Sequence, residues 1–185
     1  MVKKVSKVFL VISICLVLAG CGCIKKTAKG AVEDYLNQYK NLSSNVISDM
    51  DNIIKDENLT DKQKEVYTDA LKRQYQDLKY SIESEDYNGD NATVEVKITV
   101  YDLYKVQKEA DEYLSNNPDE FKDGDVYSDE LYMDYKLDKM KKSTDTVDYN
   151  ITFNVTKDDN GNYQVVDLSS QDLEKIHGIY NYDAS

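Results

Sequence analysis

The 185-residue sequence contains one histidine, one proline, seven glycines, three cysteines and no tryptophan. A single histidine leaves little scope for a histidine-based metal site or acid–base pair. The few glycines leave little material for a phosphate-binding loop, and no Walker, dinucleotide-binding or nucleophile-elbow motif occurs. We therefore expect no catalytic residue, no cofactor and no metal, and interpret the chain as a non-enzyme.

Basic residues are also scarce, with 23 Lys and Arg against 35 Asp and Glu and a net charge of −12. Binding to nucleic acid depends on cationic contacts with phosphate, so this balance argues against a nucleic-acid partner. It also argues against a domain lying flat on an anionic membrane. With 41% hydrophobic residues in periodic patterns, the sequence predicts a globular domain and not a disordered one.

No apolar run is long enough for a membrane-spanning helix, which needs about 20 residues. A dense apolar, uncharged run covers residues 8–19 and follows Lys3, Lys4 and Lys7. A basic start followed by a short apolar run is typical of a secretory signal. An uncleaved anchor and a buried core helix are the weaker alternatives, because the run is short and has no polar face.

The residues Leu18-Ala19-Gly20-Cys21 resemble a bacterial lipoprotein lipobox. The resemblance implies that the signal is cut between Gly20 and Cys21 and that diacylglycerol is attached to the Cys21 sulfur. The membrane would then be a partner through this covalent lipid, with the protein on the extracytoplasmic face of the cell membrane. We expect residues 1–20 to be removed, residues 21–27 to form a lipidated tether and residues 28–185 to form one domain.

The remaining cysteines fit this interpretation. Cys15 would leave with the signal, so Cys23 alone would keep a free thiol, and the domain must be stable without an internal disulfide. Removal of the signal leaves 165 residues and changes the net charge from −12 to −15, because it takes three basic residues and no acidic one. That charge favours a soluble domain standing off the bilayer.

The hydrophobic periodicity predicts an α+β fold. Helical spacing predicts one long helix over residues 27–55, loosened at Ser43-Ser44, and a helix that begins at a Thr60–Gln63 capping box. Alternating patterns predict two hairpins, turning at residues 88–90 and 158–162. Further helices are expected over residues 103–114, 128–141 (with a Ser128 cap) and 170–180. The consistent solution is an antiparallel sheet of about four strands wrapped around the long N-terminal helix.

This layout, with the sequence AVEDYLNQY at Ala31–Tyr39 behind a lipobox, resembles small Gram-positive lipoproteins of unknown function. Those proteins have a cystatin-like or nuclear-transport-factor-2-like domain, and the resemblance implies this fold. It implies no activity, because it carries no diagnostic functional residue.

Tyrosines provide the first candidate site. Residues on the expected first helix, inward strand positions and a later helix would line a concave pocket between helix and sheet. The alternative is that they are core residues whose hydroxyls reach the rim. The candidates are Tyr35, Tyr39, Tyr80, Tyr135 and Tyr149, with Tyr132 beside them.

Acidic residues provide the second candidate site. From Asp111 to Asp134 the sequence has nine acidic residues and a single basic residue, Lys122. Asp119, Glu120, Asp123 and Asp125 would form a patch for a cation or a basic partner. The alternative is a solvated connection between two helices.

Two further motifs are weaker. His177 lies three residues after Glu174, a helical spacing that would suit a metal or acid–base pair, but we expect this histidine to lie near solvent. Asp158–Asn162 superficially resembles a calcium loop, but the glycine and glutamate positions of an EF-hand are occupied by Tyr163 and Ser169. A hairpin turn explains its composition.

Three functions remain open. The first is a lipid-anchored, non-enzymatic binding module whose partner is an envelope protein. The second is a carrier or sensor that holds an unidentified small molecule in the tyrosine-lined cavity. The third is a hydrolase or isomerase, which would require carboxylates, or a carboxylate and His177, to converge in one cleft.

Overall fold

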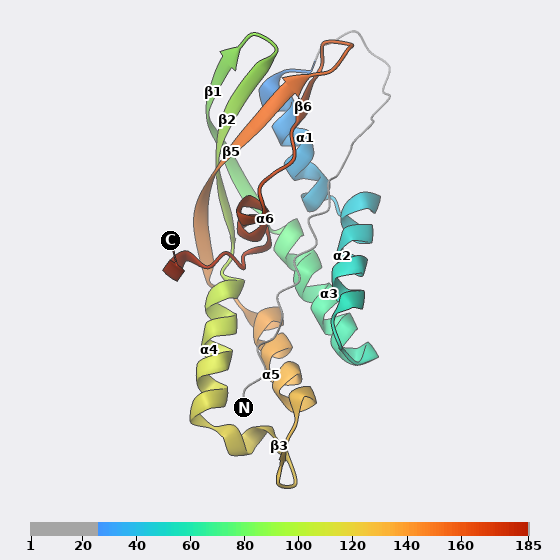
Figure 1. The fold of residues 1–185 in the computed structure, drawn as a ribbon, viewed down its shortest axis with the longest axis vertical. Helices are drawn as coiled ribbons and strands as arrows, with labels where there is room; N and C mark the ends of the chain where they lie inside the picture. Colours follow the sequence, from blue (N-terminus) through green and yellow to red (C-terminus); the bar gives the residue numbers. More distant parts are fainter. Residues whose placement is uncertain (1–25, 185) are drawn as a thin grey trace.

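The computed structural model describes residues 26–184 of the chain. The expected signal, the lipobox with Gly20 and Cys21, and Cys23 lie outside these residues. Figure 1 shows an elongated α+β molecule, with a curved sheet in one half and packed helices in the other. None of the described helices combines the length and the apolar character needed to cross a bilayer.

The described chain forms six α-helices, two short 3-10 helices and six strands. The helices are α1 (Ala28–Lys40), α2 (Ser44–Asp56), α3 (Asp61–Gln76), α4 (Leu103–Asn116), α5 (Asp129–Lys142) and α6 (Ser170–His177), with η1 (Pro118–Phe121) and η2 (Tyr182–Ala184). The strands are β1 (Lys79–Asn88), β2 (Asn91–Tyr101), β3 (Lys122–Asp123), β4 (Val126–Tyr127), β5 (Thr146–Lys157) and β6 (Tyr163–Val165).

The main sheet is antiparallel with strand order β1-β2-β5-β6. β2 and β5 pair from Asn91 opposite Thr156 to Tyr101 opposite Thr146. The entire α4–α5 segment is inserted between these two paired strands. Alternate residues of β2 and β5 are buried, as the predicted alternation requires, so one face of the sheet belongs to the core.

The hairpin turns lie where the sequence predicts them. Asn88 pairs with Asn91, which leaves Gly89 and Asp90 as a two-residue loop, and Gly89 adopts a φ of 63°. A glycine meets this requirement without the strain that a side chain would introduce. The turn at residues 158–162 lies at the same end of the sheet, which we call the turn end (Figure 1).

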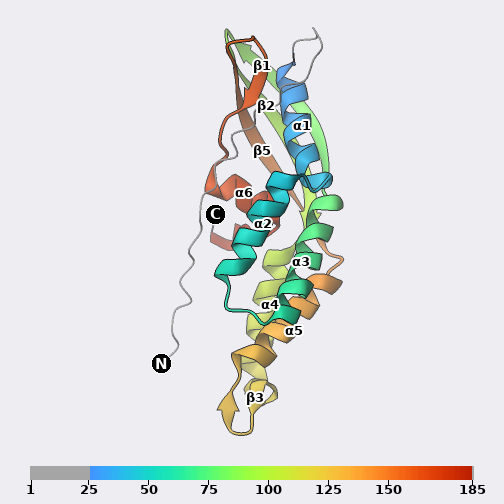
Figure 2. The ribbon, with the colours of Figure 1, turned by 90° about the vertical axis from the view of Figure 1, so that its right-hand side faces the viewer.

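The prediction of one long N-terminal helix is wrong, because the chain forms α1 and α2 instead. Leu42 lies between them with a φ of 49°, the only non-glycine residue with positive φ among those described. The Ser43 hydroxyl accepts a hydrogen bond from the Val46 N–H at 3.5 Å and begins a second helix. The break allows α1 to lie against the sheet while α2 packs on α3 (Figure 2).

The core has two parts. The first lies between the sheet and α1, with contributions from α2, α3 and α6, and includes the fully buried Leu36, Ile98 and Phe153. The second lies between α3, α4 and α5 and includes Leu103 and Leu137. α3 contributes to both parts, because Leu71 and Tyr75 face the first and Ala70 faces the second. The sheet half and the helical half are therefore packed on one shared helix.

Gln74 of α3 lies where the two halves meet and is 1% exposed. Its carboxamide oxygen accepts a hydrogen bond from the Tyr101 N–H at 3.1 Å, and its nitrogen donates to the Ile176 carbonyl at 3.3 Å. Gly178, which ends α6 with a φ of 71°, lies against this group. A Cβ atom on Gly178 would lie 2.2 Å from the Tyr101 carbonyl oxygen and 2.5 Å from Gln74 Nε2.

Gly178→Ala should therefore lower the free energy of unfolding by at least about 2 kcal/mol, through both backbone strain and the clash. Gly89→Ala is the matched control, since its φ of 63° is similar but no atom lies within 4 Å of the added Cβ. Its cost should be about 1 kcal/mol, from backbone strain alone. Urea denaturation measures both variants, and equal losses would contradict the close packing at Gly178.

Candidate functional site

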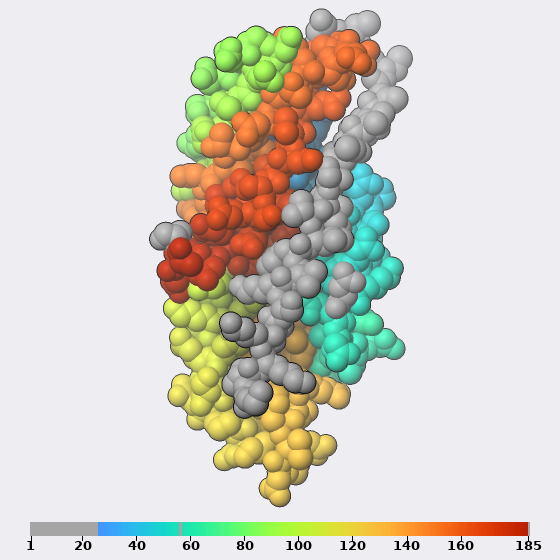
Figure 3. Space-filling model, viewed as in Figure 1, coloured from blue at the N-terminus to red at the C-terminus, as the bar shows by residue number. Residues whose placement is uncertain are grey.

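Residues 117–131 follow α4, lead into α5 and form the far end of the α4–α5 segment; we call them the tip. The tip contains η1, the paired strands β3 and β4, and the first turn of α5. Figures 1 and 2 place it at the opposite end of the molecule from the turn end. The space-filling view in Figure 3 shows the tip as a narrow projection beyond the packed helices.

Aromatic side chains pack between the tip and helices α4 and α5. Phe121 is 3% exposed and makes edge contacts with Tyr132 and Tyr135 at centroid distances of 5.6 and 5.5 Å. Tyr135 also stacks on Tyr113 of α4 at 4.9 Å. The Ser128 N–H donates to the Phe121 carbonyl at 2.8 Å and joins the two ends of the β3–β4 connection. These contacts fix the tip on α4 and α5.

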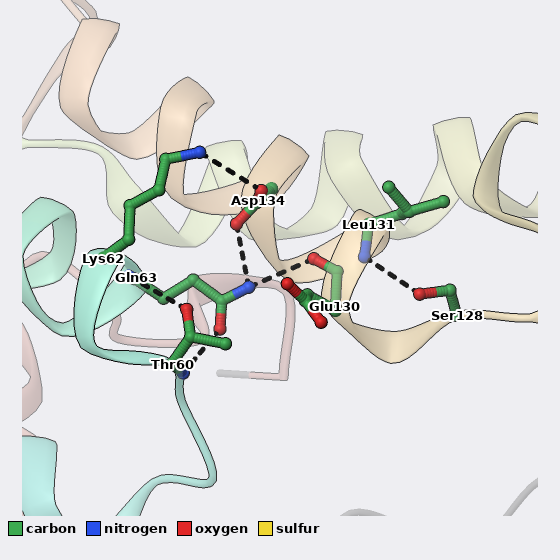
Figure 4. Close-up of polar contacts among 7 residues, drawn as sticks. All are labelled: Thr60, Lys62, Gln63, Ser128, Glu130, Leu131 and Asp134. Carbon is green, nitrogen blue, oxygen red and sulfur yellow. Dashed lines mark hydrogen bonds and ion pairs between the residues drawn. The ribbon is translucent and has the colours of Figure 1, made fainter. Parts of the chain in front are cut away.

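A second support comes from Gln63 at the start of α3 (Figure 4). The Thr60–Gln63 capping box is confirmed, with Thr60 N–H donating to Gln63 Oε1 at 3.0 Å. The Gln63 Nε2 group donates to the Glu130 carbonyl at 3.1 Å and to Asp134 Oδ1 at 2.8 Å. The predicted Ser128 cap is also confirmed, because its hydroxyl accepts from Leu131 N–H. The start of α3 and the start of α5 are thus held together by the polar contacts of the buried Gln63 side chain.

Apolar side chains are concentrated at the tip. Val126 is 71% exposed, Tyr127 45% and Leu131 42%, and these are three of the five large apolar residues exposed in the described chain. The other two, Tyr87 and Val166, lie in or beside the sheet. A cluster of exposed apolar groups is typical of an interaction surface, whereas isolated ones are ordinary. The sequence analysis missed this cluster, since nothing in the local pattern shows that these residues lack a cover.

The four predicted acidic patch residues all lie in the tip. Asp119 pairs with Lys122, whose ammonium group lowers the pKa of that carboxyl. Both Glu120 oxygens accept from the Tyr113 hydroxyl at 3.0 Å. Asp125 precedes Val126, and Asp123 lies opposite Val126 in the β3–β4 pair; neither carboxylate forms an ion pair within residues 26–184.

Two more carboxylates belong to this surface, Asp129 and Glu130 in the first turn of α5. They also form no ion pair in the described part of the chain. Asp129 accepts a hydrogen bond from the Tyr127 hydroxyl. Burial, the Asp129 charge and this hydrogen bond, in that order, raise the Tyr127 pKa. The first turn of α5 suits these two carboxylates, because the helix dipole stabilises negative charge at a helix N-terminus. The tip therefore presents both apolar groups and uncompensated negative charge.

The predicted pocket tyrosines do not form one group. Tyr35 and Tyr39 of α1 pack together at 5.8 Å under the sheet, and burial raises the pKa of both. The Tyr80 hydroxyl donates to Asn37 at 3.3 Å, while Tyr149 packs edge-on to Tyr180. Tyr135 belongs to the aromatic support of the tip instead. A cavity lined by the other four stays a prediction.

His177 is not the solvent-side residue that the sequence analysis expects. Its ring is half-buried and packs on Tyr75 and Tyr39, with Nδ1 2.9 Å from the Tyr75 hydroxyl. Burial lowers the histidine pKa from 6.5 to about 4, so the ring is neutral at physiological pH. The position serves packing, since the ring lies against two tyrosines and forms no ion pair with Glu174 in the described part of the chain.

The Asp158–Asn162 segment forms the predicted turn. Asp158 Oδ1 accepts from the backbone N–H groups of Asn160 and Asn162 at 2.9 and 2.8 Å, and these bonds lower the pKa of this carboxyl. Its other oxygen accepts from Gln164. No group of three or more potential metal-ligating side chains occurs among the described residues.

Comparisons with models of known protein families, with characterised proteins and with solved structures find no match.

The His177 environment predicts a pH effect on stability. As pH falls below about 6.5 the unfolded chain binds a proton that the folded chain does not bind until about pH 4. Folding stability should therefore fall by up to roughly 3 kcal/mol across this window and stay lowered below it. The measurement is urea denaturation from pH 7 to 4.5, with His177→Gln as control. Carboxylate titrations are common to both proteins, so identical pH profiles would contradict the prediction.

Two buried tyrosine hydroxyls should respond oppositely to removal. The Tyr149 hydroxyl is buried and has no hydrogen-bond partner among the described residues, whereas the Tyr75 hydroxyl bonds His177. Tyr149→Phe should leave stability unchanged or raise it by about 1 kcal/mol, while Tyr75→Phe should lower it by about 1–2 kcal/mol. Chemical denaturation compares the two variants. A marked loss in Tyr149→Phe would reveal a hydrogen-bond partner at that hydroxyl.

Proposed function

We propose that the chain is a lipid-anchored lipoprotein of the extracytoplasmic face of the cell membrane, acting there as a non-enzymatic protein-interaction module. The observation that carries the proposal is the concentration of exposed apolar side chains at the tip. Such a cluster favours a protein partner, because the tip is small and convex and small-molecule sites are concave. The expected partner is another protein of the envelope.

The described chain begins at Lys26, at the opposite end of the molecule from the tip. Lys26 is fixed at the turn end, where its N–H donates to Asn162 and its carbonyl accepts from Tyr163 N–H. Cys21 precedes Lys26 by five residues, which span at most about 18 Å when extended. A lipid on Cys21 would therefore keep the turn end near the bilayer and direct the tip away from it.

The finer fold assignment, a cystatin-like or nuclear-transport-factor-2-like domain, is part of the proposal. Its support is a curved antiparallel sheet whose buried face packs against α1 (Figure 2). The α4–α5 segment would then be an addition to that common layout, placed between two neighbouring strands. Function often lies in sites added to a common fold, which agrees with an interaction site at the tip of the added segment.

A second candidate, a small-molecule carrier or sensor, is favoured by one observation. The Tyr149 hydroxyl lies buried beneath the sheet without a partner among the described residues. A polar ligand that reached this hydroxyl would satisfy it. The site lies far from the tip, so the two candidates can be separated by experiment.

Native mass spectrometry of the protein, extracted in mild detergent from the membrane of the cells that make it, tests these proposals. We expect a chain that begins at Cys21, carries a diacylglyceryl-sized increment and retains a bound polypeptide. Cys21→Ala should lose the increment and leave the membrane fraction, because two acyl chains supply most of the membrane affinity.

The opposing results are specific. A full-length mass without lipid would contradict the anchor. A lipidated protein with an added small mass in place of a polypeptide, and loss of that mass in Tyr149→Phe, would replace the interaction module by the carrier.

A further inference from the structure

Four carboxylates lie among the apolar residues of the tip along the chain. Asp123 and Asp125 belong to the β3–β4 connection, and Asp129 and Glu130 to the first turn of α5. Val126, Tyr127 and Leu131 alternate with them along the chain and are all exposed. An apolar patch with charge of one sign at its rim has the chemistry of a surface that selects a partner of the opposite charge.

The cations nearest to these carboxylates in the chain and across the α3–α5 contact are already engaged. Lys122 pairs with Asp119, and Lys62 pairs with Asp134 at 3.6 Å. The tip thus retains negative charge that the described chain does not neutralise. A partner that brings positive charge would gain favourable interactions here without displacing an existing ion pair.

A second copy of the chain is a poor occupant, because two tips would repel each other. The basic end of α5 does not offer a complementary surface either, since Lys141 pairs with Asp69 at 2.9 Å and Lys142 with Asp138 at 2.8 Å. An anionic bilayer would be repelled as well. The remaining occupant is a cationic segment of a different protein.

The tip is also held in place before any partner binds. Gln63 fixes the first turn of α5 to α3, and Phe121 fixes η1 to α4 and α5. A preorganised surface loses little conformational freedom on binding, so even a small patch can contribute usable affinity.

We propose that the tip binds a cationic amphipathic segment of an envelope protein. Apolar side chains of that segment would cover Val126, Tyr127 and Leu131, and its lysine or arginine side chains would lie among the four carboxylates. This inference rests on the proposed function and adds the chemistry of the partner.

The first test places the photo-cross-linking residue p-benzoyl-phenylalanine at Tyr127 in the full chain, in the cells that make it. Tyr87 of β1, which is 50% exposed, is the control position. We expect an adduct specific to position 127 whose cross-linked peptide has net positive charge and apolar residues. An adduct with an acidic or uncharged peptide would overturn the inference and leave the interaction module standing. Absence of an adduct specific to position 127 would overturn both.

The second test measures binding of a synthetic peptide of leucine and lysine to the purified full chain in mild detergent. Asp123→Asn/Asp125→Asn/Glu130→Gln should raise the dissociation constant roughly tenfold at low salt. The matched control, Asp51→Asn/Glu65→Gln/Asp86→Asn, changes net charge equally at exposed positions away from the tip and should have little effect. Equal weakening by both triple variants would show nonspecific charge attraction and overturn the proposal.

A pair of apolar variants completes the second test. Val126→Asn/Leu131→Gln should also weaken the leucine–lysine peptide, and Val166→Asn, at an exposed position near the sheet, should not. A peptide with glutamate in place of lysine should not bind the unmodified chain. Unchanged thermal unfolding midpoints show that the variants remain folded, and unchanged affinity in the tip variant would overturn the apolar part of the contact.

Discussion

The buried carboxamide of Gln74 links the two halves of the molecule. It bonds the backbone of Tyr101 at the end of β2 and of Ile176 at the end of α6, while belonging to α3, which contributes to both cores. Buried backbone groups that lack a partner are costly, so this one side chain satisfies groups that the sheet and α6 cannot satisfy themselves. The absence of a side chain at Gly178 makes room for it. The direction of the tip relative to the turn end depends on this junction.

Tyrosine hydroxyls, and not only lysines, are hydrogen-bond partners of the carboxylates in this acidic protein. The chain has 16 tyrosines and a net charge of −12. Carboxylates accept hydrogen bonds from tyrosine at several places in both halves, and these bonds stabilise negative charge. The pairs are Tyr87–Glu85, Tyr101–Asp77, Tyr104–Asp183, Tyr113–Glu120, Tyr132–Asp111 and Tyr182–Asp102. Asp77 and Asp183 have a cationic partner as well, Arg73 and Lys108. Among the described residues, Asp123, Asp125 and Glu130 have no such tyrosine or lysine partner, so their negative charge at the tip stays uncompensated.

Local signals in the sequence predicted local structure well. The Thr60–Gln63 capping box, the Ser128 cap and both hairpin turns depend on a few neighbouring residues, and all are confirmed. The division between α1 and α2 was predicted only as a loosening of one helix at Ser43-Ser44, because the apolar spacing continues across Leu42. Periodicity records which face of a segment is apolar, but it does not record whether the segment stays straight.

Candidate residues were harder to predict, because their surroundings come from distant parts of the chain. His177 meets Tyr75, which lies 102 residues earlier, and no local pattern signals that contact. The acidic patch was found from composition, whereas the apolar residues beside it resembled ordinary strand and helix positions. Tyr135 was grouped with the sheet tyrosines for a similar reason, since residue type alone does not show which of the two cores a tyrosine joins.

The α4–α5 segment leaves and rejoins the sheet at paired positions, because Tyr101 lies opposite Thr146 and the Asp102 N–H donates to the Asp145 carbonyl at 2.9 Å. In topological terms it is a very long hairpin loop, and its length is independent of the strand register. One additional helical turn in both α4 and α5 would move the tip by about 5.4 Å while the sheet stayed unchanged. The molecule thus contains a spacer of adjustable height, through which homologous chains or engineered variants can set the reach of the tip separately from the stability of the domain.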